Sequence, residues 1–174
     1  MLDEKFIKRM ERLLGEEGLK NYLSELDIAY ARTLGGDNNT FKLPEDFHAW
    51  MPTAHHTNPA LLSMLDEFLA FDYEKMYISS RRERLFYLWG HAFEFVKEED
   101  WALLDEIGKR VSASNDVWCA TNTEIYDYVT AYAALVYSAD NTTVYNPTLQ
   151  TLWFERDGEL YKVASGETLT GLLV

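Results

Sequence analysis

The sequence predicts an α/β protein in which a few parallel strands with flanking helices are followed by a small C-terminal antiparallel β hairpin region. Before Asp140, short apolar runs alternate with segments of helical spacing, a pattern typical of a parallel sheet. After it, β-branched and aromatic residues dominate, and Asp157-Gly158 separates two alternating runs, which is a strong hairpin signal. We therefore expect residues 1–140 to form a β/α domain and residues 141–174 a β-rich appendage packed on it.

Helical spacing and capping signals mark the flanking helices. Residues 3–26 carry apolar side chains at helical spacings interrupted by glycines, and predict two short helices or one bent helix. Asn58 is expected to cap a helix that begins directly after it. Acidic residues near position 98 favour the N-terminus of the next helix. Thr121 and Glu124 have the spacing of a capping box, which predicts a further helix.

Short apolar runs predict the strands. They are found at residues 27–33, 47–53, 84–91 and 116–122. The run over 84–91 has no polar alternation, as expected for a strand that is covered on both faces.

Composition excludes several classes of protein. The formal net charge is -13 and the pI about 4.6, so a nucleic acid or an anionic membrane would be repelled. The single cysteine, Cys119, excludes an internal disulfide and a Cys-rich zinc site, and we expect it to be a packed thiol. The N-terminus is charged throughout and no apolar run reaches the ~20 residues of a membrane span. As written, the chain is expected to be a cytoplasmic protein.

Polar side chains end three of the predicted strands. Arg32, His56 and His91 occupy these positions, where reactive groups gather in parallel sheets. His55 precedes His56, and consecutive strand residues point to opposite faces, so the pair is not expected to bind one metal within a regular strand. Glu94, three residues after His91, is placed to orient its imidazole. The alternatives are histidines that are hydrogen-bonded at the sheet rim and a glutamate that is solvated or caps a helix.

A resemblance to a known family rests on runs that occur in order between residues 27 and 150, namely "YART", "PTAHH", "YLWGHAFEF", "DVWCATNTEIYDYVTAY" and "YSADNTTVYNPT". Together they resemble the C-terminal half of bacterial polysaccharide deacetylases of the NodB-homology type. That resemblance implies part of a distorted β/α barrel and a divalent metal, often zinc, held by one Asp and two His. It also implies a second Asp as base and a late-strand histidine that protonates the leaving amine of an N-acetylated sugar. This histidine aligns with the end of Leu88-Trp89-Gly90-His91, so the resemblance implies that His91 is the general acid.

The chain departs from this family at the residues that hold the metal and the base. The Thr-Phe-Asp-Asp and Arg-x-Pro-Tyr/Phe motifs are absent, and Ala60 follows His56-Thr57 where the second histidine of His-Ser/Thr-x-x-His belongs. Without that pocket there is no Lewis acid. We therefore expect a truncated or catalytically impaired relative that hydrolyses weakly, if at all, by itself.

Three hypotheses follow for the function. The first is a partial deacetylase that keeps a sugar-facing edge, with Arg32, His56, Trp89 and Glu94 binding an N-acetylated sugar polymer or oligomer. Another is a non-catalytic carbohydrate-binding or assembly module that works through its aromatic residues.

The remaining hypothesis is an enzyme with a rebuilt divalent-metal site, with zinc as the expected ion. Its imidazole ligands would be His55 or His56 together with His91. Its carboxylate would be one of Asp66, Glu94 and Asp116.

A partial barrel leaves one edge of its sheet open. Such an edge has unpaired backbone groups that must be covered. We expect either that the N-terminal helical segment covers it or that two chains pair across it as a homodimer.

Overall fold

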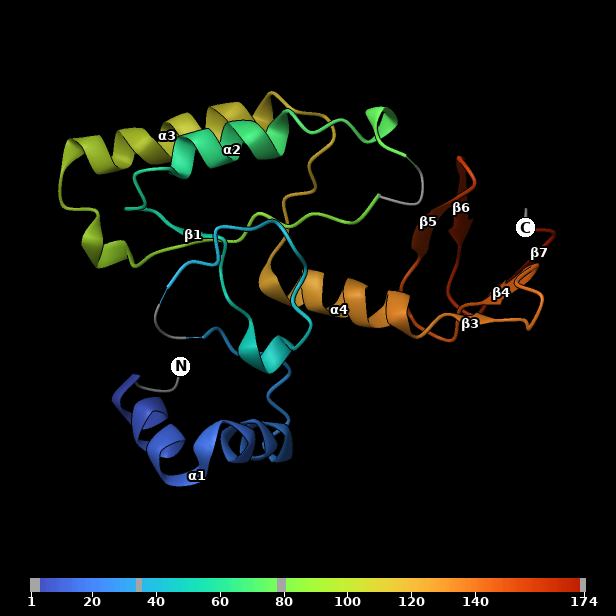
Figure 1. The fold of residues 1–174 in the computed structure, drawn as a ribbon, viewed down its shortest axis with the longest axis horizontal. Helices are drawn as coiled ribbons and strands as arrows, with labels where there is room; N and C mark the ends of the chain where they lie inside the picture. The colour runs from blue at the N-terminus through green and yellow to red at the C-terminus, as the bar shows by residue number, and fades with distance from the viewer. Residues whose placement is uncertain (1–3, 34–35, 78–80, 173–174) are drawn as a thin grey trace. The chain divides into compact units, whose positions relative to one another are not determined.

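The computed structural model describes residues 4–33, 36–77 and 81–172 of the chain. Within this part the fold is mixed α/β, with four α-helices and small sheets (Figure 1). The helices are α1 (Glu4–Glu25), α2 (Leu61–Leu69), α3 (Glu98–Ser112) and α4 (Asn122–Ala133). The expected α/β class is confirmed.

The chain divides into two compact units. Unit 1 consists of Met1–Phe71 and Arg82–Val117, and unit 2 of Asp72–Arg81 and Trp118–Val174. The division at residue 140 expected from composition stays a prediction.

The sheet of unit 1 is parallel and very short. β1 (Ala54–His55) pairs with β2 (Leu88–Trp89), with Ala54 opposite Leu88 and His55 opposite Trp89. A parallel bridge joins Arg32 to Trp50 ahead of β1. Three successive stretches of chain therefore run in the same direction, as expected for a parallel sheet.

Most of the residues expected in these strands are not in regular strand conformation. The run over 47–53 begins with a 3₁₀ helix at Phe47–Ala49, where the Asp46 carboxylate accepts a hydrogen bond from the His48 backbone N–H. The run over 27–33 contributes one bridge residue, and the described residues 116–122 contain no strand. Short apolar runs without alternation carry no register signal of their own, which explains these differences.

The core of unit 1 lies between the parallel pair and two helices. Ala54, Leu61 and Met64 are buried there, and partly buried side chains of β2 and α3 pack against them. α2 and α3 contact one another and lie side by side in Figure 1. α2 begins at Leu61, later than predicted, although the Asn58 side chain does accept the Ala60 backbone N–H.

The other helices follow their sequence signals closely. α1 is one bent helix, with its kink at Gly15, where φ is 72°. α3 begins at Glu98, as expected. α4 begins after Thr121, whose side chain accepts the Glu124 backbone N–H while the Glu124 carboxylate accepts the Thr121 backbone N–H.

Unit 2 contains the antiparallel strands. β3 (Val136–Tyr137), β4 (Thr143–Tyr145) and β7 (Thr168–Thr170) form one sheet, while β5 (Leu152–Arg156) and β6 (Glu159–Val163) form a hairpin. Asp157 and Gly158 turn the hairpin with φ values of 49° and 83°, as a type I′ turn requires. The expected C-terminal hairpin is confirmed. Side chains from α4, β4, β5 and β6 form its buried core, which includes Val144, Leu152 and Val163.

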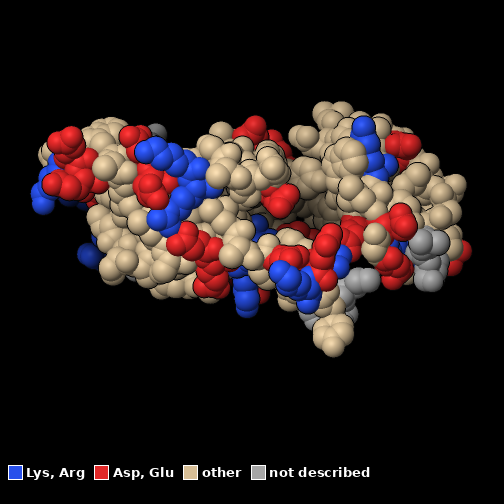
Figure 2. Space-filling model, turned by 90° about the horizontal axis from the view of Figure 1, so that it is seen from above, with Lys and Arg blue, Asp and Glu red and all other residues tan. Residues whose placement is uncertain are grey.

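The surface carries charged side chains of both signs. Acidic and basic side chains are interspersed over the face drawn in Figure 2. Cys119 is exposed and unpaired, so the expected packed thiol is wrong, because residues near it are not in a buried strand. No helix in the described ranges is long and apolar enough to cross a bilayer. The homodimer stays a prediction.

Candidate functional site

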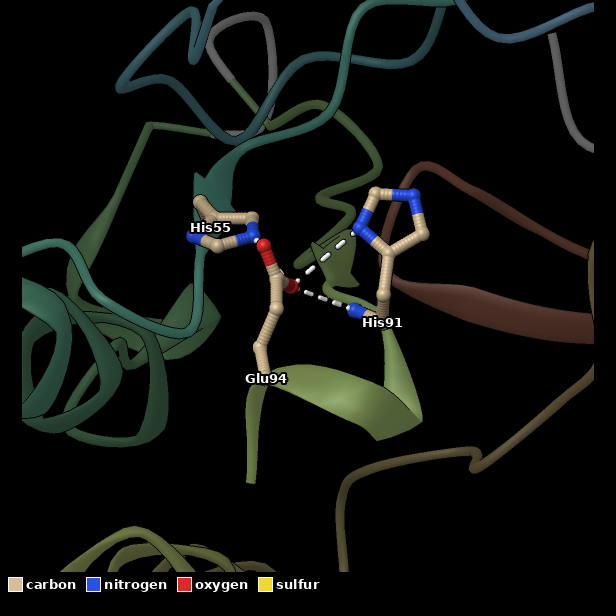
Figure 3. Close-up of side chains that lie close together, drawn as sticks. All are labelled: His55, His91 and Glu94. Carbon is tan, nitrogen blue, oxygen red and sulfur yellow. Dashed lines mark hydrogen bonds and ion pairs between the residues drawn. The ribbon is translucent and has the colours of Figure 1, made fainter. Parts of the chain in front are cut away.

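Two imidazoles converge on one carboxylate oxygen in unit 1. Glu94 Oε2 lies 3.2 Å from His55 Nε2 and 3.2 Å from His91 Nδ1, and it also accepts the His91 backbone N–H at 2.7 Å. Figure 3 shows both rings directed at this carboxylate, while the second ring nitrogen of His91 points away from it. Since an ionised carboxylate only accepts hydrogen bonds, these two ring nitrogens carry the protons.

The parallel pair of strands explains the convergence. His55 ends β1 opposite Trp89, and His91 follows β2 by two residues, so both histidines leave the sheet at the same edge. A 3₁₀ turn, η4 (Ala92–Glu94), then folds Glu94 back onto the backbone of His91 as a capping box. His55, His91 and Glu94 therefore meet at the carboxyl ends of two parallel strands, where the sequence predicted that polar groups gather.

The tautomer of His55 is set by Thr57. His55 Nδ1 lies 2.7 Å from the Thr57 hydroxyl oxygen and accepts the Thr57 backbone N–H at 3.3 Å. With Nδ1 as acceptor, Nε2 holds the hydrogen that is donated to Glu94. The His55 side chain is 15% exposed and that of His91 47%, so His91 is the more accessible of the two.

His56 lies beside this group but is buried. Its side chain is 3% exposed, and its Nδ1 atom is 3.8 Å from Glu94 Oε2 and has no hydrogen-bond partner among the described residues. The ring stacks on Phe95 at 4.4 Å. β1 ends at His55, so the chain turns at His56, and the strand alternation expected to separate the two histidines does not apply. Both rings therefore face the same carboxylate.

The ring of His56 borders an apolar hollow of about 390 Å³. Its lining includes Leu88, Trp89, Phe95 and Trp101 but not His91. His56 and His91 thus both lie beside Glu94, but His91 does not line this hollow.

Trp89 links the group to a further carboxylate. The Trp89 ring lies 4.3 Å from the His55 ring, and the guanidinium carbon of Arg32 lies 3.8 Å above the indole. The indole N–H donates to Asp37 Oδ1 at 3.0 Å, and the Asn58 amide donates to Asp37 Oδ2 at 2.9 Å. Arg32 and Trp89, both expected to bind substrate, therefore contact each other at the edge of the histidine group.

Asp37 was missed from sequence because it lies in a polar loop after a Gly-Gly pair. Its signal is its position just after the first predicted strand, at the same sheet edge as the histidines. It anchors the β1–β2 ends by accepting hydrogen bonds from Trp89 and from the His55 backbone N–H.

Both carboxylates are held in the ionised form. The backbone N–H of His91, followed by the two imidazoles, lowers the pKa of Glu94 below its ordinary value, although partial desolvation opposes this. Burial works to raise the pKa of Asp37. Hydrogen bonds from the His55 backbone, Trp89 and Asn58 outweigh it, so the pKa of Asp37 also lies below its usual range.

His55, His91 and Glu94 could together hold a metal ion. Each offers one ligand atom, and these atoms lie within 4.8 Å of one another. Of the other carboxylates considered from sequence, Asp66 instead pairs with Arg110 at 2.6 Å. Asp116 does not belong to this group either.

Comparisons of the chain with models of known protein families, with curated proteins and with solved structures found no match.

Proposed function

We propose that the chain is related to polysaccharide deacetylases and that His91 and Glu94 form the proton-donating side of a site for N-acetylated carbohydrates. The reaction is hydrolysis of the carbon–nitrogen bond of a sugar acetamide. The observation that carries the proposal is the contact of His91 Nδ1 with Glu94 Oε2 at 3.2 Å, which leaves Nε2 directed away from the carboxylate.

This arrangement suits general acid catalysis. An amine leaves an amide only when it is protonated, and a histidine near neutral pH can deliver that proton. Glu94 accepts the Nδ1–H of His91 and orients the ring, so that Nε2 is left to face the leaving nitrogen. Phe93 stacks on the His91 ring at 5.0 Å, and Trp89 meets it edge-on at 5.7 Å, which limits rotation of the ring.

The surrounding residues supply a surface for a sugar. Trp89 and the Arg32 guanidinium stacked on it border the histidine group, so an aromatic ring and hydrogen-bond donors lie beside the proposed proton donor. The three parallel stretches of unit 1 support a partial distorted β/α barrel. The family motifs that hold the metal and the catalytic base are absent from the sequence, so we expect the chain by itself to be a weak catalyst.

A second candidate uses the same residues as a metal centre. Tetrahedral zinc with bonds of about 2.0–2.1 Å separates its ligand atoms by about 3.3 Å. The two nitrogen–oxygen distances of 3.2 Å at Glu94 match that spacing. Zinc bound by His55, His91 and Glu94 would supply Lewis-acid catalysis. For this, both histidines must change tautomer. His55 must donate its Nδ1–H to Thr57 so that Nε2 is released for the ion, and His91 must carry its hydrogen on Nε2 so that Nδ1 is released.

Acetate release from chitin oligosaccharides tests the first candidate. We expect wild-type protein to release acetate slowly, and His91→Gln to lower the rate by about 10²–10⁴-fold through loss of the acid. Glu94→Gln should also lower the rate, because the charged acceptor that orients the His91 ring is lost. His48→Gln is the matched control, since His48 Nε2 contacts the Ile28 carbonyl and none of the site residues.

Three outcomes distinguish the proton-donor role, the non-catalytic binding module and the metal centre. Acetate release that is equal in wild type and His91→Gln contradicts the proton-donor role. Saturable oligosaccharide binding with no acetate release, in wild type, supports the alternative of a non-catalytic carbohydrate-binding module. Stoichiometric zinc that survives dialysis, and is lost in His55→Gln but not in His48→Gln, supports the metal centre.

A further inference from the structure

A second cluster in unit 1 surrounds Arg84 and shares no residue with the group at Glu94. The guanidinium carbon of Arg84 lies 3.9 Å from the ring centroid of Phe71 and 4.4 Å from that of Phe41. Phe68 is the third ring, at 5.4 Å. Aromatic faces attract a guanidinium and fix its plane, so the N–H groups of Arg84 are held in a narrow range of directions.

One nitrogen of the guanidinium lacks a hydrogen-bond partner in the part of the chain that the structure describes. Its Nη1 atom is buried and has no hydrogen-bond partner among the described residues. Among the described residues, Arg84 makes cation–π contacts with three aromatic rings and no ion pair with a carboxylate. Arginine stays charged at all accessible pH values, and an unsatisfied buried donor on a charged group is costly.

Arg84 lines a hollow of about 360 Å³ together with Lys42. Within the described ranges, Lys42 also makes no ion pair. The chain has 29 Asp and Glu residues and 16 Lys and Arg residues, so acidic partners outnumber the basic groups. Lys42 is exposed, so its lack of an ion pair is ordinary, but the buried Nη1 of Arg84 has no acidic partner among the described residues although acidic residues are in excess.

We propose that this hollow binds a small molecule through an oxyanion group, a carboxylate or a phosphate. The guanidinium fork donates two N–H hydrogen bonds to such a group, and Lys42 adds a second positive charge. Because the phenylalanine rings already restrain Arg84, binding costs little side-chain entropy. Glu67 and Glu83 also line the hollow and would repel an extended polyanion, which limits the ligand to a compact one.

The proposal does not rest on the histidine site, and each can fail without the other. Its test is a titration of full-length protein with inorganic phosphate and, separately, with acetate, both at constant ionic strength. The readouts are the NMR signal of the Arg84 Nε–H and the backbone amides of residues 39–42. We expect saturable shifts of these signals, and the anion that saturates at lower concentration identifies the preferred group.

Variants locate the binding. Arg84→Met should abolish the saturable shift, and Arg84→Lys, which keeps the charge but loses the fork, should weaken binding by about tenfold. Lys42→Met should weaken it less, by about threefold to tenfold. Lys109→Met on α3 removes the same charge outside the hollow and should bind as wild type does. Far-ultraviolet circular dichroism shows whether each variant is folded.

Two results overturn the proposal. One is the absence of a saturable response to either anion in the wild-type protein. The other is equal weakening by Lys109→Met and Lys42→Met in folded protein, because that result would assign the effect to overall charge.

Discussion

Gly90 lies against the buried ring of His56 and leaves no space for a side chain. A Cβ atom at this position would be 2.3 Å from His56 Nδ1. His56 cannot move away easily, since it is held by Phe95 on one side and by its backbone N–H, which donates to the Trp89 carbonyl. The glycine is therefore required for the close approach of the two strand ends.

Replacement of this glycine is expected to destabilise the fold. Gly90→Ala should lower the free energy of unfolding by about 1–3 kcal/mol, the usual cost of overpacking, as measured by urea denaturation. Gly108→Ala is the control, because nothing lies within 4 Å of a Cβ there. In the interior of α3 it should instead raise stability by about 0.5–1 kcal/mol. Equal stability of wild type and Gly90→Ala would show that His56 can move.

Glu94 makes the stability of unit 1 depend on pH. Its pKa is lowered in the folded protein, so its interactions with His91 and His55 stabilise the fold above the ordinary glutamate pKa of about 4.3. This stabilisation is lost as the pH falls through the lower folded-state value. Between pH 5 and pH 3, wild type should therefore lose more unfolding free energy than Glu94→Gln does in urea titrations. Parallel loss in both proteins would count against the interaction, and Glu159→Gln on β6 controls for the change of charge.

At this scale, part of the site could be predicted and part could not. His55, His91 and Glu94 were candidates because histidines at strand ends and a carboxylate three residues on are local signals. The contact of Asp37 with Trp89 joins residues 52 positions apart across a loop, and no local pattern specifies it. The burial of His56 depends in the same way on where Phe95 and Gly90 pack.

The helix α4 is the element that its sequence specifies best. Thr121→Ala removes the hydroxyl that accepts the Glu124 backbone N–H and should cost about 1 kcal/mol of unfolding free energy, measured by urea denaturation. Thr130→Ala in the same helix removes an exposed hydroxyl within the helix and should be neutral or slightly stabilising. A larger loss in Thr130→Ala than in Thr121→Ala would contradict the capping role.

Elements with local signals were predicted well and elements with distant partners were not. Caps and helical spacing define α3 and α4, and the Asp157-Gly158 turn defines the β5–β6 hairpin. The parallel pair needs partners 34 residues apart, as from Ala54 to Leu88, so its length is decided by packing against α2 and α3. The run at 116–122 shows the same limit, since apolar composition alone did not produce a strand.

Across the whole molecule, the net charge of -13 opposes compaction. Raising sodium chloride from about 10 mM to about 150 mM shortens the Debye length from about 30 Å to about 8 Å. We therefore expect the free energy of unfolding at pH 7 to rise over this range, as measured by urea titration. Potassium chloride should give the same rise, because screening depends on ionic strength. A fall would mean that surface ion pairs such as Lys20 with Asp46 outweigh the repulsion.

Unit 2 takes up Asp72–Arg81, ten residues that interrupt unit 1 in the chain. During synthesis on the ribosome these residues emerge long before Trp118–Val174, with which they belong. The second stretch of unit 1, Arg82–Val117, is synthesised before the strands of unit 2 with which Asp72–Arg81 pack. The nascent chain must therefore keep Asp72–Arg81 out of wrong pairings until the C-terminal hairpin leaves the exit tunnel.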